Sequence, residues 1–231
     1  IMSILVAGAS TGIGNALVAA LRARSDEPVY TISRSDLGQH NLQIDLSDAS
    51  NISAVQTFLA LIQPTRVFCC AGMLHDDTHM PEKMLSQIQD DWVFESFSKN
   101  VLTHIHLAQA LAPVLTKTSS LKWLSLSAKV GSLDDNALGG WYSYRMSKTA
   151  LNMFIKNLSI EWGRKSPEIY VASLHPGTTD SELSKPFHNN ISPDRLYSAE
   201  QTATRLIDVM DHFGQAEQGK LLNWDGTVIA Y

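Results

Sequence analysis

The sequence contains very little cysteine: of its 231 residues, only Cys69 and Cys70 are cysteines. Two adjacent cysteines cannot join distant parts of a fold, so a disulfide framework is excluded. Both lie in an apolar stretch that we expect to be buried, as suits two reduced thiols in a reducing compartment. A zinc or vicinal redox site here is disfavoured, because no third cysteine exists to complete a ligand set.

Long apolar runs and a strong net charge are also missing. No stretch of about 18 apolar residues occurs, so we expect no membrane-spanning helix. No basic and then apolar leader precedes the first expected strand, and with reduced cysteines this predicts a cytoplasmic protein. We interpret Met2, which follows Ile1, as the natural start. The net charge of −5 disfavours nucleic acid and anionic membranes as partners.

What the chain does have is a regular alternation of short apolar segments and helical patterns. The expected strands are 3–7, 29–32, 41–45, 66–70, 121–126, 169–174 and 220–223, and the longest expected helices are 88–115 and 144–165. This order predicts one α/β domain over residues 1–231, a doubly wound parallel sheet of about seven strands with helices on both faces. Such sheets bind ligands where the carboxyl ends of their strands meet.

A glycine-rich turn joins the first expected strand to the first helix. Residues 8–14 read Gly-Ala-Ser-Thr-Gly-Ile-Gly and lead directly into a helical pattern. Glycines permit a tight turn and close backbone approach, and the helix start presents free N–H groups to a phosphate. A plain strand-to-helix turn is the alternative interpretation. We expect Gly8, Gly12 and Gly14 to hold the phosphates of a dinucleotide.

The end of the second expected strand bears on the choice of dinucleotide. An acidic residue there commonly binds the ribose 2′-hydroxyl of NAD, whereas an arginine suits a 2′-phosphate. This strand ends at Ser33-Arg34, without an acid. Because a guanidinium matches a phosphate in charge and geometry, Arg34 favours NADP(H) over NAD(H), although an ordinary surface arginine would look the same.

Tyr144 and Lys148 are the main candidates for chemistry. They lie four residues apart in an expected helix, so their side chains share one face. An ammonium beside a phenol favours the phenolate and brings proton transfer closer to neutral pH. Alone, such a pair would more often be an exposed aromatic beside a solvated lysine. The glycine turn and the series of expected strands elsewhere in the chain favour the catalytic interpretation of this pair.

Other polar residues carry weaker signals. Asn100 lies inside an expected helix, where asparagine has poor propensity, so it needs a reason unless it is simply exposed. His75 and His79 have metal-like spacing but lie in an expected loop without an acidic partner pattern, so no metal site is predicted. Residues 178–197, rich in turn formers, are expected to form a lid over a pocket, and we call them the lid segment.

Taken together, these residues resemble the short-chain dehydrogenase/reductase family over nearly the whole chain. The stretches that carry the resemblance are 8–14, Ala71-Gly72, Asn100, 144–148 and Pro176-Gly177. The insert at 131–140 and the ending Asn-Trp-Asp-Gly at 223–226 are similar to the C-factor and sniffer-type carbonyl reductase branch. In this family the two long helices usually form a pairing surface, which implies a homodimer or homotetramer.

The resemblance also implies roles for individual residues. Tyr144 would exchange a proton with the substrate oxygen, Lys148 would bind the nicotinamide ribose and lower the pKa of Tyr144, and Asn100 would hold a water that links Lys148 to solvent. Apart from the resemblance, Trp141, Phe187 and Tyr197 are candidates for an apolar lining of the substrate pocket, and ordinary packing is the alternative interpretation. The remaining implied cofactor contacts are Ser10, Thr11 and Ile13 at the phosphates, Arg34 at the 2′-phosphate, Asp45 and Leu46 at the adenine, and Ala71, Gly72, Pro176, Gly177, Thr178 and Ser181 along the rest of the cofactor.

Two departures from the family pattern stand out. Cys69-Cys70 replaces asparagines that brace the sheet, which predicts altered stability rather than lost cofactor binding. The family's catalytic serine lies three residues before a glycine, and counting back from Gly131 gives Ala128. Ser127 is one residue away, so a bend at the strand end would be needed to turn it into the site. Ser127 is the candidate for this role.

The leading hypothesis is an NADP(H)-dependent oxidoreductase that transfers a hydride between the nicotinamide and a small carbonyl or alcohol. The alternative is an NAD(P)(H)-binding signalling or redox-sensing protein with little turnover, which the displaced serine favours. Non-redox chemistry such as dehydration or epimerisation on the same fold is a third interpretation.

Overall fold

The computed structural model describes residues 2–231 and is built on one eight-stranded sheet. Seven strands run parallel, and the edge strand β10 pairs antiparallel with β9. In spatial order they are β3 (Asn41–Gln43), β2 (Val29–Ser33), β1 (Ile4–Ala7), β4 (Arg66–Cys69), β5 (Leu121–Leu126), β6 (Ile169–His175), β9 (Leu221–Asn223) and β10 (Val228–Ile229). The expected doubly wound parallel sheet is confirmed; β10 was not expected.

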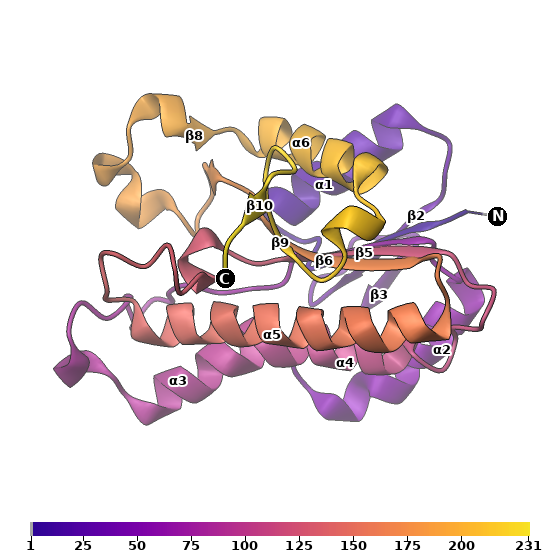
Figure 1. The fold of residues 1–231 in the computed structure, drawn as a ribbon, viewed down its shortest axis with the longest axis horizontal. Helices are drawn as coiled ribbons and strands as arrows, with labels where there is room; N and C mark the ends of the chain where they lie inside the picture. Colours follow the sequence, from indigo (N-terminus) through magenta and orange to yellow (C-terminus); the bar gives the residue numbers. More distant parts are fainter. Residues whose placement is uncertain (1) are drawn as a thin grey trace.

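Helices cover both faces of this sheet (Figure 1). On one face lie α1 (Gly12–Arg24) and α6 (Ala199–His212), which pack against each other. On the other lie α2 (Ile52–Ile62), α4 (Thr103–Leu111) and α5 (Tyr142–Lys165), with α3 (Asp90–Phe97) extending past the sheet alongside α5.

The core has two halves because side chains alternate along each strand. Leu5, Val67 and Trp123 point toward the α2, α4 and α5 layer. Their neighbours Val6, Phe68 and Leu124 point toward α1 and α6. Every strand at the centre of the sheet is therefore buried on both sides, as parallel sheets require.

The helix expected over 88–115 is interrupted rather than continuous. α3 and α4 are joined by a π-helical turn at Ser98–Leu102, which contains Asn100. Such wide turns are often found at functional sites. Asn100 is fully buried, so its interpretation as an exposed polar residue is wrong.

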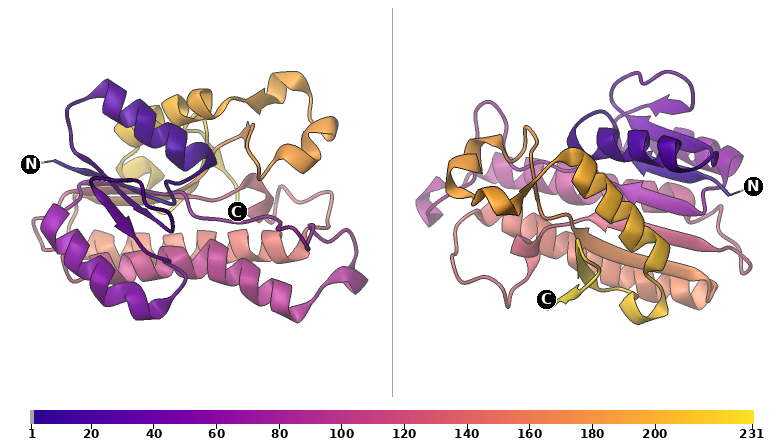
Figure 2. Two further views of the ribbon diagram at one scale, coloured as in Figure 1. Left: turned by 180° about the vertical axis from the view of Figure 1, so that it is seen from behind. Right: turned by 90° about the horizontal axis from the view of Figure 1, so that it is seen from above.

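The lid segment lies on the same side of the sheet as α1 and α6 (Figure 2). It begins with β7 (Thr178–Thr179) and ends with β8 (Leu196–Tyr197), and these short strands pair in parallel. Between them are 3₁₀ turns at Lys185–Asn190 and Pro193–Arg195. The lid segment thus leaves β6 and returns to the start of α6.

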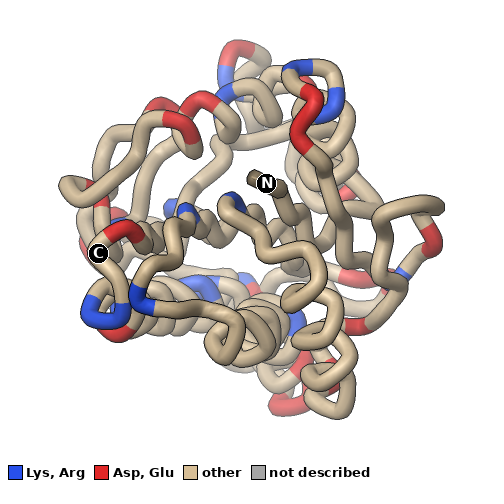
Figure 3. The backbone as a smooth tube through the Cα atoms, turned by 90° about the vertical axis from the view of Figure 1, so that its right-hand side faces the viewer, with Lys and Arg blue, Asp and Glu red and all other residues tan. Residues whose placement is uncertain are grey.

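Acidic and basic residues are interspersed along the chain, as Figure 3 shows. Among residues 2–231, no helix is both long enough and apolar enough to cross a bilayer. Within the same range, no group of three or more histidine, cysteine or acidic side chains is arranged to hold a metal ion.

Candidate active site

The site forms where the strand order reverses, between β1 and β4. Residue pairing aligns the ends of these strands, with Ala7 opposite Ile32 on one side and Cys69 on the other. At Gly8 the backbone has φ +78°, and a Cβ there would lie 2.7 Å from the backbone nitrogen of Ala71. The glycine turn therefore lies directly against the end of β4, and only glycine fits.

The start of α1 leaves backbone donors available. A Cβ on Gly14 would lie 2.1 Å from the carbonyl oxygen of Gly8, so the turn closes on itself too tightly for any side chain. Thr11, the N-cap residue, makes no side-chain hydrogen bond to the helix. The first N–H groups of α1 are thus uncapped, as a phosphate-binding helix start requires. Across the turn, Ser181 of the lid segment lies 3.7 Å from where a Gly12 Cβ would be.

Arg34 follows β2 and is exposed at the same edge of the sheet. Its positive charge reaches Asp45, which also lies 3.5 Å from the ammonium of Lys99. Partial burial of Asp45 works against ionisation, but hydrogen bonds from Ser47 and these two cations prevail and lower its pKa. The structure therefore brings Arg34 and Asp45 together beside the glycine turn, with Leu46 buried next to them.

Tyr144 and Lys148 lie on one buried face of the first turns of α5. The Lys148 ammonium is 5.7 Å from the centre of the Tyr144 ring. Tyr144 is 9% exposed and Lys148 3% exposed, so neither is the solvated side chain of the alternative interpretation. The ammonium donates a 2.9 Å hydrogen bond to the carbonyl of Leu126, at the end of β5. This bond fixes the pair at the carboxyl edge of the sheet.

Burial dominates the titration of both groups. It lowers the pKa of Lys148 to about 8, although the Cys69 and Cys70 thiols act in the opposite direction. It also raises the pKa of Tyr144 above its usual value. In the protein alone this effect of burial is opposite in direction to the lowering expected from Lys148, and that lowering stays a prediction.

Asn100 connects the π-helical turn to the end of β4. Its side-chain oxygen accepts a 2.7 Å hydrogen bond from the Met73 nitrogen, and its amide donates to the Met73 carbonyl at 2.8 Å and to the Ser147 hydroxyl at 3.1 Å. A Cβ on Gly72 would lie 3.1 Å from the Asn100 oxygen and 3.2 Å from the Lys148 ammonium. A side chain at position 72 would therefore crowd both Asn100 and Lys148.

Ala128, and not the predicted Ser127, lies beside Tyr144. β5 continues regularly, with the Ser127 nitrogen donating to the Leu174 carbonyl at 2.8 Å, so no bulge turns its side chain. The Ser127 hydroxyl instead donates to Asn152 on α5 at 2.7 Å. Ala128 packs beside Tyr144 in a small apolar cluster. The prediction of Ser127 at the reaction centre is therefore not supported by its geometry.

A buried polar relay that the sequence did not suggest braces the end of β4. The Trp123 indole donates to the Ser125 hydroxyl at 2.8 Å, and this hydroxyl donates to Nδ1 of His104, 2.9 Å away, because Nε2 of the neutral ring faces a carbonyl oxygen and must carry the ring proton. His104 Nε2 then donates to the Ala71 carbonyl at 3.0 Å. Burial, aided by the charge of Lys148, lowers the pKa of His104 to about 3, so the ring is neutral. The relay supports the strand end that Cys69-Cys70 leaves without asparagine amides.

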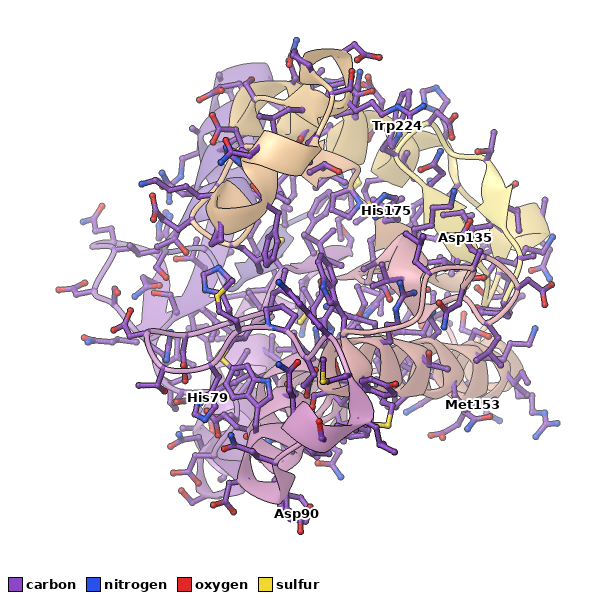
Figure 4. All side chains as sticks on the ribbon, turned by 90° about the vertical axis from the view of Figure 1, so that its left-hand side faces the viewer. His79, Asp90, Asp135, Met153, His175 and Trp224 are labelled. Carbon is purple, nitrogen blue, oxygen red and sulfur yellow. The ribbon has the colours of Figure 1, made fainter. Side chains whose placement is uncertain are left out.

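His175, at the end of β6, was also not singled out by the sequence. Figure 4 looks at the site end of the molecule and shows His175 below Trp224 and to the left of Asp135, with His79 farther to the lower left. Within residues 2–231, Nδ1 of His175 and Nη1 of Arg205 are the buried side-chain atoms that lack a hydrogen-bond partner. Burial, and then the charge of Lys129, lowers the pKa of His175 to about 4.

The three aromatics expected to line a pocket separate into two groups. Trp141 and Phe187 have ring centres 5.0 Å apart, and both pack against the cluster containing Tyr144. Tyr197 instead lies 5.7 Å from Trp224, and the Arg205 guanidinium stacks on both rings. Trp141 and Phe187 therefore lie beside Tyr144, while Tyr197 anchors the end of the lid segment to α6.

Comparison with known proteins decides the family. The family model described as short chain dehydrogenase matches residues 2–192. This chain belongs to the short-chain dehydrogenase/reductase family. It is an NAD(P)-dependent enzyme of that family, as the sequence predicted.

Two curated relatives of this short-chain dehydrogenase/reductase extend the comparison. The 1-hydroxy-2-glutathionyl-2-methyl-3-butene dehydrogenase of Rhodococcus sp. (strain AD45) is 26% identical over 240 residues, covering 99% of each protein. The C-signal of Myxococcus xanthus is 28% identical over 137 residues, covering 59% of this chain and 76% of that protein.

Solved structures show the same fold. Carbonyl reductase Sniffer of D. melanogaster superposes with a TM-score of 0.85 at 22% identity over 100% of both chains. An NADPH-bound carbonyl reductase from chicken fatty liver has a TM-score of 0.82 at 22% identity, over 100% of this chain and 99% of that one. The C-signal and Sniffer similarities agree with the predicted branch.

Proposed function

We propose that this short-chain dehydrogenase/reductase is an NADP(H)-dependent oxidoreductase that transfers a hydride between the nicotinamide and a small carbonyl or alcohol. One observation carries the proposal: Tyr144 and Lys148 share a buried face of α5 at the carboxyl edge of the sheet. They lie beside Gly72, where a side chain would crowd Lys148, and across from a glycine turn too tight for side chains. These features fit a dinucleotide lying along the strand ends.

The cofactor-binding residues follow from their places along this edge. The uncapped start of α1, with Gly8, Ser10, Thr11, Gly12, Ile13 and Gly14, would hold the phosphates, and Ser181 lies next to the same turn. Arg34 would bind a 2′-phosphate, which favours NADP(H), and Asp45 with Leu46 would flank the adenine. Ala71, Gly72, Pro176, Gly177 and Thr178 would line the nicotinamide end.

The chain's own groups can carry the proton. When bound, the cofactor supplies the hydride at its nicotinamide ring. Burial keeps Tyr144 protonated at neutral pH, so its hydroxyl can donate to the oxygen of a carbonyl as hydride reaches the carbon. Lys148, with its pKa near 8, can return a proton to this phenol, and Asn100 holds the neighbouring backbone at Met73. Trp141 and Phe187 would exclude water from the substrate side.

The test is oxidation of NADPH over a panel of aldehydes and ketones, compared with Tyr144→Phe. We expect turnover with at least one small carbonyl and a loss of about 10²-fold or more in the variant, because general acid catalysis contributes this much. NADPH affinity should stay within twofold. Equal turnover by the two proteins would overturn the assignment of Tyr144.

A second function is favoured by one feature, Ala128 beside Tyr144 in place of the family's serine. Without that hydroxyl the site has one fewer donor for the substrate oxygen, as a signalling or redox-sensing protein with little turnover would tolerate. Tight NADPH binding without turnover of any substrate in the panel would favour this function.

We further propose a single domain over residues 1–231, a cytoplasmic location and a homodimer or homotetramer. The exposed apolar side chains of Phe94 on α3 and Met153 on α5 support self-association through these helices. Equilibrium sedimentation that shows only monomer at micromolar concentration would contradict the oligomer.

A further inference from the structure

A buried carboxylate from a distant segment holds the start of α5. Glu82 lies in the connection between β4 and α3 and is 3% exposed. Its two carboxylate oxygens accept hydrogen bonds from the Ser143 nitrogen at 3.3 and 3.2 Å, and one of them also accepts from the Ser143 hydroxyl. The Glu82 carbonyl accepts from the Trp141 nitrogen. Glu82 thus binds the two residues on either side of the first residue of α5.

The helix needs this contact because its own sequence provides no cap. The N-cap residue of α5, Trp141, has φ 53° and ψ 43° and makes no side-chain bond to the helix. An uncapped helix leaves its first N–H groups without partners, and these are costly when buried. A carboxylate at this end also interacts favourably with the helix dipole. Glu82 therefore supplies from 61 residues away what a serine or aspartate N-cap normally supplies locally.

The loop before α5 lies against the backbone of Glu82. Gly139 and Gly140 both have φ +65°, and a Cβ on Gly140 would lie 3.2 Å from the Glu82 carbonyl oxygen. Arg145, in the first turn, donates to the Gly140 carbonyl at 3.1 Å and to the Val130 carbonyl at 3.3 Å. Arg145 thus holds the loop to the helix, and the bonds from Trp141 and Ser143 hold both to Glu82.

We propose that Glu82 is a positioning residue for Tyr144. Tyr144 follows Ser143 directly. The bonds from Ser143 to Glu82 therefore set the position of the first turn along the axis of α5 and its rotation about that axis, and this turn carries the phenol. The same segment places Leu74 against Tyr144, so it contacts the reaction centre as well as the helix start. This inference rests on the proposed function, since it assumes that Tyr144 transfers the proton.

The test compares Glu82→Ala, Glu82→Gln and Glu82→Asp with Glu161→Ala, which removes an exposed carboxylate from α5 itself. We expect Glu82→Ala to lower kcat by about 10- to 100-fold, because a displacement of about 1 Å has this effect on catalysis. NADPH affinity should change less than twofold. Glu82→Gln keeps the reach and an acceptor oxygen and should retain most of the activity, whereas Glu82→Asp keeps the charge but is too short and should not.

A second measurement does not depend on turnover. Amide hydrogen exchange over residues 141–146 should become at least about 10-fold faster in Glu82→Ala than in the native protein, and should stay unchanged in Glu161→Ala. If Glu82→Ala does not fold, the same acceleration is expected in Glu82→Asp. Unchanged exchange, or equal kcat for the Asp and Gln variants, would overturn the role of Glu82. Full activity of Tyr144→Phe would instead overturn the proposed function, whatever the exchange shows, so the two failures are distinguishable.

Discussion

The hydroxyl of Ser127 donates a 2.7 Å hydrogen bond to the side-chain oxygen of Asn152, two turns of α5 beyond Tyr144. Both side chains are almost fully buried, at 4% and 1% exposure. The Asn152 amide in turn donates to the Gly131 carbonyl at 3.2 Å. The serine therefore joins β5 to α5 inside the core, and the methyl group of Ala128 faces the reaction centre in its place.

Substitution of these two neighbours should separate stability from catalysis. Ser127→Ala leaves the Asn152 oxygen without its donor and should lower the free energy of unfolding by about 1–3 kcal/mol, with kcat nearly unchanged. Ala128→Ser places a hydroxyl beside Tyr144 and should raise kcat by about 10-fold or more, since one oxyanion donor is typically worth about 10²–10³. Urea denaturation and NADPH oxidation measure the two effects. A large loss of kcat in Ser127→Ala would return that residue to the mechanism.

Arg34 should determine the preference between the two cofactors. Arg34→Ala removes charge-assisted hydrogen bonds to a 2′-phosphate and should weaken NADPH binding by about 10- to 100-fold, equivalent to about 1.5–3 kcal/mol. NADH, which lacks this phosphate, should bind within twofold of the native affinity. Calorimetric titration with each cofactor checks the result, and Arg22→Ala, an exposed arginine on α1, is the matched control. Equal weakening for both cofactors would contradict a 2′-phosphate contact.

The His104 relay should make the free energy of unfolding depend on pH in the acidic range. The pKa of His104 falls from an ordinary 6.5 to about 3 in the folded protein. Between these pH values His104 is therefore protonated in the unfolded chain but neutral in the folded protein. Stability should therefore decline as pH falls from about 6.5 toward 3, and this decline should be smaller in His104→Ala. His175 has a similarly lowered pKa and should account for part of the slope that remains.

At pH 7 the same variant should be less stable, because the Ser125 hydroxyl and the Ala71 carbonyl lose their partner. We expect a loss of about 2–4 kcal/mol in the free energy of unfolding. Gln109→Ala, on the exposed side of α4, should change stability by less than about 0.5 kcal/mol. Equal stability of the two variants would show that the relay does not brace β4.

Lys148 should make stability depend on pH in the same direction as His104, but in the alkaline range. Its pKa is about 8 in the folded protein against an ordinary 10.5, so the charged ammonium destabilises the fold below pH 8. Compared with Lys148→Met, the native protein should gain stability as pH rises from about 8 to about 10.5, by on the order of 3 kcal/mol. Both proteins carry Tyr144, whose own titration cancels in the comparison. Parallel stability curves would show that Lys148 is not desolvated as the structure indicates.

Local sequence patterns account for the positions of the strands, the glycine turn and the pair Tyr144 and Lys148. The strands are short apolar runs bounded by turn residues, and their alternation with helices leaves a doubly wound sheet as the expected arrangement. The glycine turn can be predicted from the spacing of its glycines alone, because only glycine fits the backbone conformation of this turn. Tyr144 and Lys148 share a face because four residues make about one helical turn.

Other features depend on partners far away in the sequence. The direction of Ser127 was decided by Asn152, the neutral ring of His104 by Ser125 and Ala71, and the start of α5 by Glu82. No local pattern marks Glu82, since it lies in an irregular connection among other polar residues. Its role appears only when the chain brings it to a helix that lacks its own cap.

The sequence by itself therefore determined the sheet, the glycine turn and the shared face of Tyr144 and Lys148, because each depends on residues within a few positions of one another. Only the tertiary structure decided which buried polar groups meet, and thus that Ala128 rather than Ser127 faces the phenol. The physical reason is that a buried donor or acceptor must find a partner wherever the fold places one, and burial also decides which protonation state survives there.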